Sequence, residues 1–222
     1  MAPIRILRRR IMHRGPVFDV VREQIKISGH RVEWDIIHHP GAAVILPMLG
    51  RSRIVFVRQY RRAAGRRILE LPAGTLEPGE PPLACARREL REETGWTASR
   101  WRRLIEFYPA PGISTERMVL YRAEGLRLTG HAEPEAGEVL QTVILSVPEA
   151  LARIRTREIC DAKSILGVLI AAGAHGTDIR VPRAGTKPDG LRRHGPRPPG
   201  VIAACPGSRE RRAGGRGGHL RR

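Results

Sequence analysis

Residues 74 to 96, GTLEPGEPPLACARRELREETGW, contain three carboxylates, Glu89, Glu92 and Glu93, at helical spacing behind a loop punctuated by glycines. In a helix with about 3.6 residues per turn, positions i, i+3 and i+4 share one face, so three negative charges would crowd together. Like charges at this spacing destabilise a helix, and a hard cation such as Mg²⁺ compensates for them while keeping positions for water and phosphate. The stretch therefore predicts a metal site for phosphate chemistry.

The bounds of this helix follow from local signals. Pro82 is tolerated in a first turn, and Gly95 lies where a left-handed C-terminal cap is expected, so we predict a helix from Pro82 to Thr94. Its apolar residues fall on a face that adjoins the acidic one. The helix can thus pack on a core and hold its glutamates at a cleft.

The same residues resemble the Nudix box, position by position: Gly74, five residues, Glu80, seven residues, Arg88-Glu89, an aliphatic Leu90, one residue, Glu92-Glu93, one residue and Gly95. Trp96 is the one departure, since the family usually has an aliphatic residue there. The resemblance implies that Gly74, Glu80, Arg88 and Gly95 support the box structurally. It also implies a nucleoside diphosphate hydrolase. The alternative is an acidic helix face that is merely solvated.

Sequence on both sides of the box resembles the ADP-ribose pyrophosphatase subfamily, over about residues 15 to 175. The matching segments are VRQYR at 57 to 61, ELPAG at 70 to 74, YPAPG at 108 to 112 and DAKS at 161 to 164. The resemblance implies Mg²⁺-dependent hydrolysis of ADP-ribose to AMP and ribose 5-phosphate, with Mn²⁺ as a substitute metal. Three alternatives stay open: hydrolysis of another nucleoside diphosphate sugar or dinucleotide, a non-catalytic module that senses ADP-ribose, and an RNA-end pyrophosphohydrolase.

Hydrolysis of a diphosphate needs neutralised phosphate charge and an oriented, partly deprotonated water. We assign Glu89, Glu92 and Glu93 as metal ligands, and the subfamily implies the Ala73 carbonyl and the Glu70 carboxylate as further oxygen donors. The general base is expected on the loop after His131, with candidates Glu133, Glu135 and Glu138. Glu138 is the first choice, and Glu93 is the alternative proton acceptor.

Three further residues are candidates for substrate binding. Arg61 is assigned to the diphosphate, because a guanidinium forks onto phosphate oxygens. Glu116 resembles a contact to ribose or across a subunit boundary in the subfamily. Trp34 is a candidate to stack on adenine, with packing in a core or dimer as the alternative.

The alternation of short apolar runs predicts a mixed sheet flanked by helices, an α/β (α+β) class, rather than a doubly wound fold. This agrees with the α/β/α sandwich that the resemblance implies. Strands are expected at 17–27, 32–37, 42–46, 54–57, 104–107, 118–122 and 140–145, and further helices from Pro148 and Asp161. We divide the chain into a small N-terminal β region at 1–40, a Nudix domain at 41–180 and a tail at 181–222. The subfamily implies that the first region joins two chains in a homodimer.

The formal charge of +18 is unevenly distributed. Residues 181–222 hold 11 Lys and Arg against 2 Asp and Glu, a net +9, and are rich in glycine and proline. Such composition predicts a disordered basic tail, with at most weak nucleic-acid contact because it lacks an aromatic residue for base stacking. Three unpatterned cysteines predict neither a disulfide scaffold nor a zinc site. No apolar run is long enough for a membrane span, and we expect a cytoplasmic protein.

Overall fold

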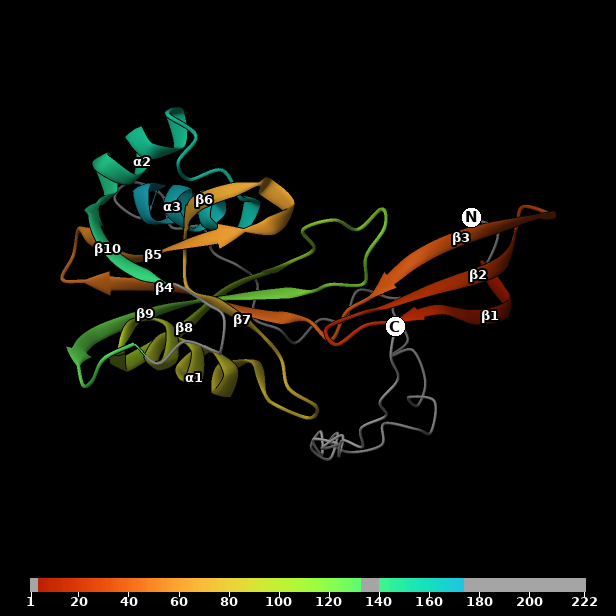
Figure 1. The fold of residues 1–222 in the computed structure, drawn as a ribbon, viewed down its shortest axis with the longest axis horizontal. Coiled ribbons are helices and arrows are strands. Elements are labelled where there is room, and N and C mark those ends of the chain that lie inside the picture. The colour runs from red at the N-terminus through yellow and green to blue at the C-terminus, as the bar shows by residue number, and fades with distance from the viewer. Residues whose placement is uncertain (1–3, 133–139, 174–222) are drawn as a thin grey trace, which may run out of the picture. The chain divides into compact units, whose positions relative to one another are not determined.

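The computed structural model describes residues 4–132 and 140–173, and its mixed sheet between helices confirms the predicted fold class (Figure 1). Ten strands are described: β1 (Arg5–Arg14), β2 (Asp19–Ile27), β3 (His30–His38), β4 (Ala42–Leu49), β5 (Arg53–Arg61), β6 (Arg66–Glu70), β7 (Ala73–Thr75), β8 (Trp96–Phe107), β9 (Met118–Leu128) and β10 (Gln141–Ser146). The helices are η1 (Arg62–Ala64), α1 (Pro82–Thr94), α2 (Val147–Arg155) and α3 (Ala162–Gly173). In this part of the chain, no helix is long and apolar enough to cross a bilayer.

The strands form two sheets. The first is an antiparallel meander of β1, β2 and β3. The second has seven strands, with the order β10-β5-β4-β9-β8, while β6 pairs with β5 and β7 pairs with β4. Strands β4 and β9 are parallel, whereas β4 is antiparallel to both β5 and β7. The larger sheet is therefore mixed, as the irregular alternation of elements predicts.

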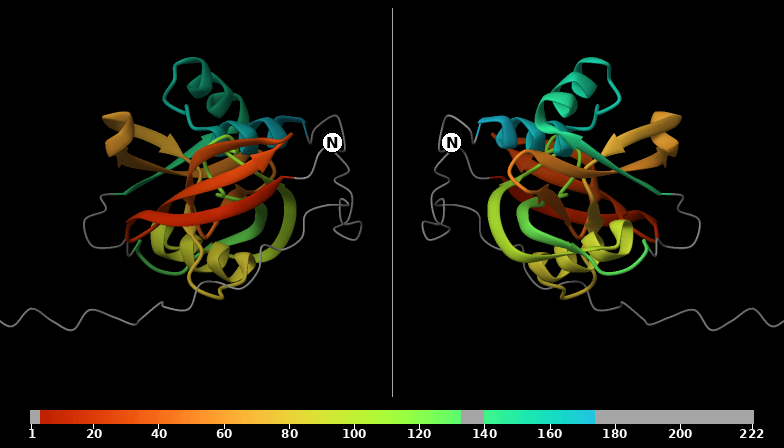
Figure 2. Two further views of the ribbon diagram at one scale, coloured as in Figure 1. Left: turned by 90° about the vertical axis from the view of Figure 1, so that its right-hand side faces the viewer. Right: turned by 90° about the vertical axis from the view of Figure 1, so that its left-hand side faces the viewer.

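The buried strand β4 supplies apolar side chains to both faces of the larger sheet. Ala43 and Ile45 belong to a core cluster with residues of α1, whereas Val44, Leu46 and Met48 belong to a second cluster with residues of α2 and α3. Successive residues of a strand point to opposite faces, which explains this division. Accordingly, α1 covers one face of the sheet, and α2 and α3 cover the other (Figures 1 and 2).

The N-terminal strand β1 was not among the predicted strands. Its sequence, RILRRRIMHR, does not alternate apolar and polar residues, and all ten residues are exposed. Its register with β2 also shifts between Ile6 and Arg8 and between Ile11 and His13, so no single face is specified by a period of two. Pairing with β2, rather than burial of an apolar face, gives β1 its conformation.

The short strand β7 determines where the box loop lies. Ala73, Gly74 and Thr75 pair with Val44, Ala43 and Ala42, so this segment is fixed along the buried strand β4. Helix α1 packs beneath the same strands through Cys85, Ala86 and Leu90, each of which is 0% exposed. The loop before the helix and the acidic face of the helix are consequently held together by the core.

Candidate active site

Helix α1 has the predicted bounds and the predicted ends. It begins at Pro82 and is followed by Gly95, whose φ of 73° is in the left-handed region and whose amide donates to the Arg91 carbonyl over 2.8 Å. A side chain at this φ is disfavoured, and a Cβ on Gly95 would lie 2.5 Å from the Gly130 carbonyl oxygen. The glycine therefore ends the helix and also admits a neighbouring strand end.

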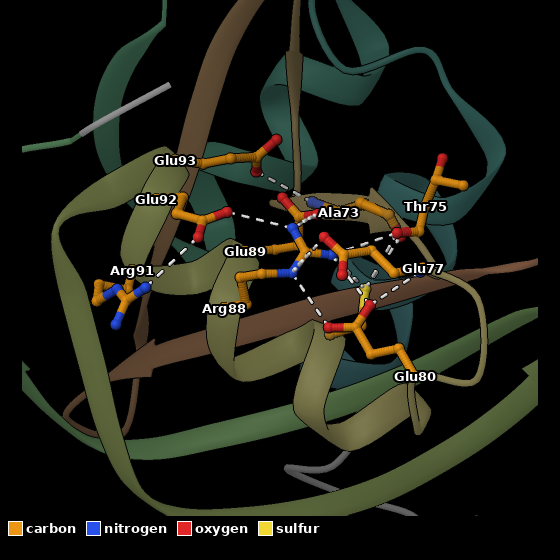
Figure 3. A network of polar contacts seen from close by, with 11 residues as sticks. Ala73, Thr75, Glu77, Glu80, Arg88, Glu89, Arg91, Glu92 and Glu93 are labelled. Carbon is orange, nitrogen blue, oxygen red and sulfur yellow. Dashed lines mark hydrogen bonds and ion pairs between the residues drawn. The ribbon is translucent and has the colours of Figure 1, made fainter. Parts of the chain in front are cut away.

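Arg88 is the centre of a polar network between the loop and the helix (Figure 3). Its Nη1 donates to Glu89 Oε1 over 2.7 Å and to Glu92 Oε2 over 3.2 Å. Its Nε and Nη2 each donate to the Glu80 carboxylate over 3.1 Å, and Nη2 also donates to the Thr75 carbonyl over 3.3 Å. One guanidinium thus donates hydrogen bonds to three carboxylates and one backbone carbonyl.

Hydrogen bonds in this network favour the ionised forms of Arg88 and Glu80. Hydrogen bonding to Arg88 holds the pKa of the Glu80 carboxyl below its usual value, while the same contact raises the pKa of Arg88. Glu80 also accepts a hydrogen bond from the Glu77 amide over 3.0 Å, which ties the loop to itself. Arg88 and Glu80 therefore stay ionised at neutral pH.

Gly74 lies against the Glu89 carboxylate. A Cβ added at position 74 would lie 1.7 Å from Glu89 Oε1 and 1.9 Å from its Cδ, far inside van der Waals contact. Beside it, the Ala73 amide donates to Glu93 Oε2 over 3.1 Å, and Glu93 is only 6% exposed. The loop therefore lies against Glu89 and Glu93. Position 74 must be glycine, because a Cβ there would overlap the Glu89 carboxylate.

The donor chemistry of this face fits a hard divalent cation. Glu89, Glu92 and Glu93 present only oxygen atoms, the ligands that Mg²⁺ prefers. Within residues 4–132 and 140–173, however, no three His, Cys, Asp or Glu side chains converge as a metal cage, and Glu89 and Glu92 are instead turned toward Arg88. A cation binding there competes with the guanidinium for two carboxylates.

Cys85, one turn before Glu89, is buried and lies 3.5 Å from the Gly74 carbonyl oxygen. Burial, followed by the nearby charges of Glu80 and Glu89, raises the pKa of its thiol to about 12. A thiol that stays protonated is a poor nucleophile. Cys85 therefore acts as an inert side chain that packs beneath the loop.

The predicted substrate contact Arg61 and the predicted metal ligand Glu70 lie against each other. Arg61 Nε donates to Glu70 Oε2 over 2.8 Å, and Lys163 Nζ lies 3.3 Å from Glu70 Oε1. Lys163 also donates to Asp161 Oδ2 over 2.8 Å, and Ser164 Oγ accepts from the Leu71 amide over 2.8 Å. The start of α3 therefore fixes the chain immediately before the box loop.

Lys163 and Ser164 received no role from the sequence, although they lie in the matched DAKS segment. Lys163 is 8% exposed and Ser164 is 0% exposed. A lysine near the start of an otherwise apolar helix is the signal that could have indicated a buried ionic contact, since buried charges need partners. One partner, Asp161, lies two positions away, but the other, Glu70, lies at the end of β6, far away in the sequence.

The other candidates lie as follows. Glu116 Oε1 is 3.9 Å from His39 Nδ1, at the place where β3 forms a parallel bridge between Ile37 and Ser114. Trp34 is in β3, opposite Glu23, and is 46% exposed. The general-base candidates Glu133, Glu135 and Glu138 lie outside the described residues.

Comparison with known proteins agrees with the arrangement of loop and helix. The NUDIX domain model matches residues 37–164. The chain belongs to the Nudix family. It is 40% identical over 175 residues to an ADP-ribose pyrophosphatase of Mycobacterium tuberculosis, covering 78% of this chain and 84% of that protein. It is 35% identical to an ADP-ribose pyrophosphatase of Bacillus subtilis, over 69% of this chain and 84% of that one.

One further relative and one solved structure are also similar to this Nudix protein. A GDP-mannose pyrophosphatase of Citrobacter koseri is 33% identical, over 69% of this chain and 83% of that protein. A solved ADP compounds hydrolase has the same fold, with a TM-score of 0.68 at 21% identity, over 77% of this chain and 93% of that one. The curated relatives support hydrolase activity, and Nudix hydrolases in general depend on divalent metal ions.

Proposed function

We propose that this Nudix hydrolase cleaves the diphosphate of ADP-ribose to AMP and ribose 5-phosphate, using Mg²⁺, with Mn²⁺ as a substitute. The acidic face of α1 held against the Gly74 loop carries the proposal. The identity of 40% with an ADP-ribose pyrophosphatase, over most of both chains, supports the choice of substrate. We also propose that the enzyme works in the cytoplasm.

Glu89, Glu92 and Glu93, together with the Ala73 carbonyl, are the proposed metal ligands, and Glu70 is a further candidate beside them. The metal supplies positive charge that offsets the charge of the diphosphate during attack by water. Arg88 holds Glu89 and Glu92 on the same side of the helix, so their orientation is set before the reaction. Arg61, 40% exposed at its side chain and anchored on Glu70, has surface left to contact a phosphate.

The proposed general base is Glu138, and Glu93 is the alternative proton acceptor. Exchange of the base for glutamine removes proton acceptance but keeps the shape of the side chain. Glu138→Gln should lower kcat by about 100-fold or more with little change in KM, whereas the matched variants Glu133→Gln and Glu135→Gln should keep wild-type kcat. A kcat loss confined to either matched variant would move the assignment to that residue.

Product analysis tests the proposed reaction. Purified protein with Mg²⁺ is incubated with ADP-ribose, nucleotide sugars, dinucleoside polyphosphates and triphosphate-ended RNA, with Glu93→Gln as the control for contaminating enzymes. The expected result is AMP and ribose 5-phosphate from ADP-ribose at the highest kcat/KM, with a loss of about 100-fold or more in Glu93→Gln. Equal product formation by Glu93→Gln would refute the proposed site.

The second candidate substrate is a nucleoside diphosphate sugar such as GDP-mannose. The relative at 33% identity named GDP-mannose pyrophosphatase favours it, because the box contacts the diphosphate and leaves the attached groups to other loops. Competition between ADP-ribose and GDP-mannose in one reaction measures the ratio of their kcat/KM values directly. If neither substrate gives activity that depends on Glu93, binding of ADP-ribose without turnover would favour a sensor instead.

A homodimer joined through β1, β2 and β3 is also proposed. Large apolar side chains on or beside these strands are exposed, including Met12 at 42%, Phe18 at 42% and Trp34 at 46%. Exposed apolar surface of this kind is typical of a subunit interface. Met12→Glu/Phe18→Glu should convert the dimer to monomer in sedimentation velocity, whereas Leu169→Glu, on the exposed side of α3, should leave it a dimer.

A further inference from the structure

A cavity of about 420 Å³ lies between α1 and β8, and its residues have no part in the proposed reaction apart from Arg88. We call it the α1–β8 pocket. It is lined by Arg87, Arg88, Arg91, Thr97, Ala98 and Trp101. Three arginines from one helix and one indole from the adjacent strand therefore face a common space. Such a combination offers positive charge and an aromatic ring to a single ligand.

The positive charge of the α1–β8 pocket is incompletely neutralised. Arg88 already donates hydrogen bonds to Glu80, Glu89 and Glu92, as described above. Within the described residues, the Arg91 side chain has one polar contact, from Nη2 to Glu92 Oε1 over 3.4 Å (Figure 3), and is 64% exposed. Arg87 is exposed, and its side chain has no hydrogen bond or ion pair to any other residue in the described ranges. Arg87 and Arg91 together give the pocket two cations for an anion.

Trp101 supplies a ring whose polar atom is already used. Its Nε1 donates to the Ala98 carbonyl over 3.2 Å, and one part of the side chain packs against the core cluster beneath α1. The ring is half-buried, so it is fixed in position yet still borders the pocket. An aromatic surface held in this way stacks on flat rings, and stacking on a base tolerates any base identity.

We propose that the α1–β8 pocket is a second nucleotide site, which binds a nucleoside monophosphate with its base on Trp101 and its phosphate on Arg87 and Arg91. The guanidinium groups match the phosphate because each can donate two parallel hydrogen bonds to it. The volume of about 420 Å³ lies within the usual range for small-ligand sites. The pocket adjoins the carboxylate face through Arg88 and Arg91, but none of its six lining residues is acidic, so its own lining does not repel a phosphate.

A nucleotide bound in the pocket would affect the carboxylate face through Arg91. A phosphate that binds the Arg91 guanidinium weakens the contact between Arg91 and Glu92, which is a proposed metal ligand. This part of the inference rests on the proposed function, whereas nucleotide binding in the pocket does not. Bound AMP is therefore expected to change kcat at saturating ADP-ribose by about two-fold or more.

Calorimetry without divalent metal tests binding. AMP, adenosine and inorganic phosphate are titrated separately into wild type, Arg87→Gln/Arg91→Gln and the control Arg62→Gln/Arg67→Gln, which loses the same charge from exposed positions at the β5–β6 hairpin. AMP should bind wild type and the control equally and Arg87→Gln/Arg91→Gln about 10-fold or more weakly. Equal AMP affinity in all three proteins would overturn the proposal.

Trp101 variants separate a nucleotide from a plain anion. Trp101→Leu should weaken AMP by about five-fold or more and leave inorganic phosphate unchanged, while Trp101→Phe keeps most of the AMP affinity. If phosphate binds as tightly as AMP and Trp101→Leu affects neither, the pocket is a simple anion site and the nucleotide proposal is wrong. Absence of hydrolysis with normal AMP binding would refute the proposed function and leave the pocket standing.

Discussion

Gly74→Ala should lower activity strongly while leaving the fold largely intact. The new Cβ would lie 1.7 Å from Glu89 Oε1 and 2.5 Å from Glu89 Cγ, and all three of the nearest atoms belong to this one flexible side chain. Glu89 must therefore swing away, which breaks its 2.7 Å contact with Arg88 and removes its oxygens from the carboxylate face. The position has no left-handed φ, so the backbone accepts alanine without strain.

Gly74→Ala should affect catalytic efficiency more than it affects stability. A displaced functional group of this kind costs about 100-fold in kcat/KM, which is about 2.7 kcal/mol of transition-state stabilisation. The free energy of unfolding should fall by only about 1 to 2 kcal/mol, because Arg88 keeps its contacts with Glu80 and Glu92. Steady-state AMP release measures the first effect, and urea unfolding followed by circular dichroism measures the second.

A double-mutant cycle with Glu89→Gln shows whether Gly74→Ala acts through Glu89. If it does, Gly74→Ala should cost little further activity in the Glu89→Gln background, because the displaced group is already impaired. Gly173→Ala is the matched control, since no atom of the described residues lies within 4 Å of a Cβ at that position. Wild-type kcat/KM in Gly74→Ala, or losses that simply multiply in the double variant, would refute the reasoning.

Three further predictions concern stability, each measured by urea unfolding. Arg88→Lys should lose about 2 to 3 kcal/mol, because one ammonium cannot fork onto Glu80 and also bridge the other carboxylates; an unchanged midpoint would contradict this. Because Arg88 holds the pKa of the Glu80 carboxyl below its ordinary value of 4.5, the stabilisation by this carboxylate is present above that pH and is lost as the pH falls through the lowered pKa. Glu80→Gln should therefore be less stable than wild type at pH 7, and the difference should shrink as the pH falls below 4.5. A gap that persists at low pH would speak against the ionic contact. Lys163→Met should lose about 3 kcal/mol, because it leaves the buried Glu70 and the half-buried Asp161 with one cation fewer, and Lys163→Arg should recover part of the loss.

The fold elements that follow from local chemistry were predicted well. Helix α1 has the predicted ends because proline and glycine act within a few residues, and its buried face follows from the helical period. Strand β1 was missed because its arginines and isoleucines alternate with no period, and its conformation depends on pairing with β2. Local signals therefore predict an element when its cause is local, and fail when the cause is another strand.

The contacts of the site were less predictable than its residues. Sequence spacing indicates that Arg88 can reach Glu92 one turn away, but its simultaneous contacts with Glu80 and the Thr75 carbonyl depend on how the loop returns over the helix. Likewise, Lys163 meets Glu70, which is far away in the sequence, only because α3 packs beside the end of β6. Spacing gives the composition of a site, whereas tertiary packing decides which charges become partners.

The arrangement around Arg88 explains how three glutamates can share one helix face before any cation binds. Glu89 and Glu92 would repel each other at this spacing, and each instead contacts the same Nη1 atom. Glu93 is separated from this pair by turning to the Ala73 amide. The fold therefore compensates the acidic face with its own donors, so metal should be needed for turnover and not for folding. The same compensation sets a limit on metal affinity, because a cation must displace a guanidinium that already has other partners in Glu80 and the loop.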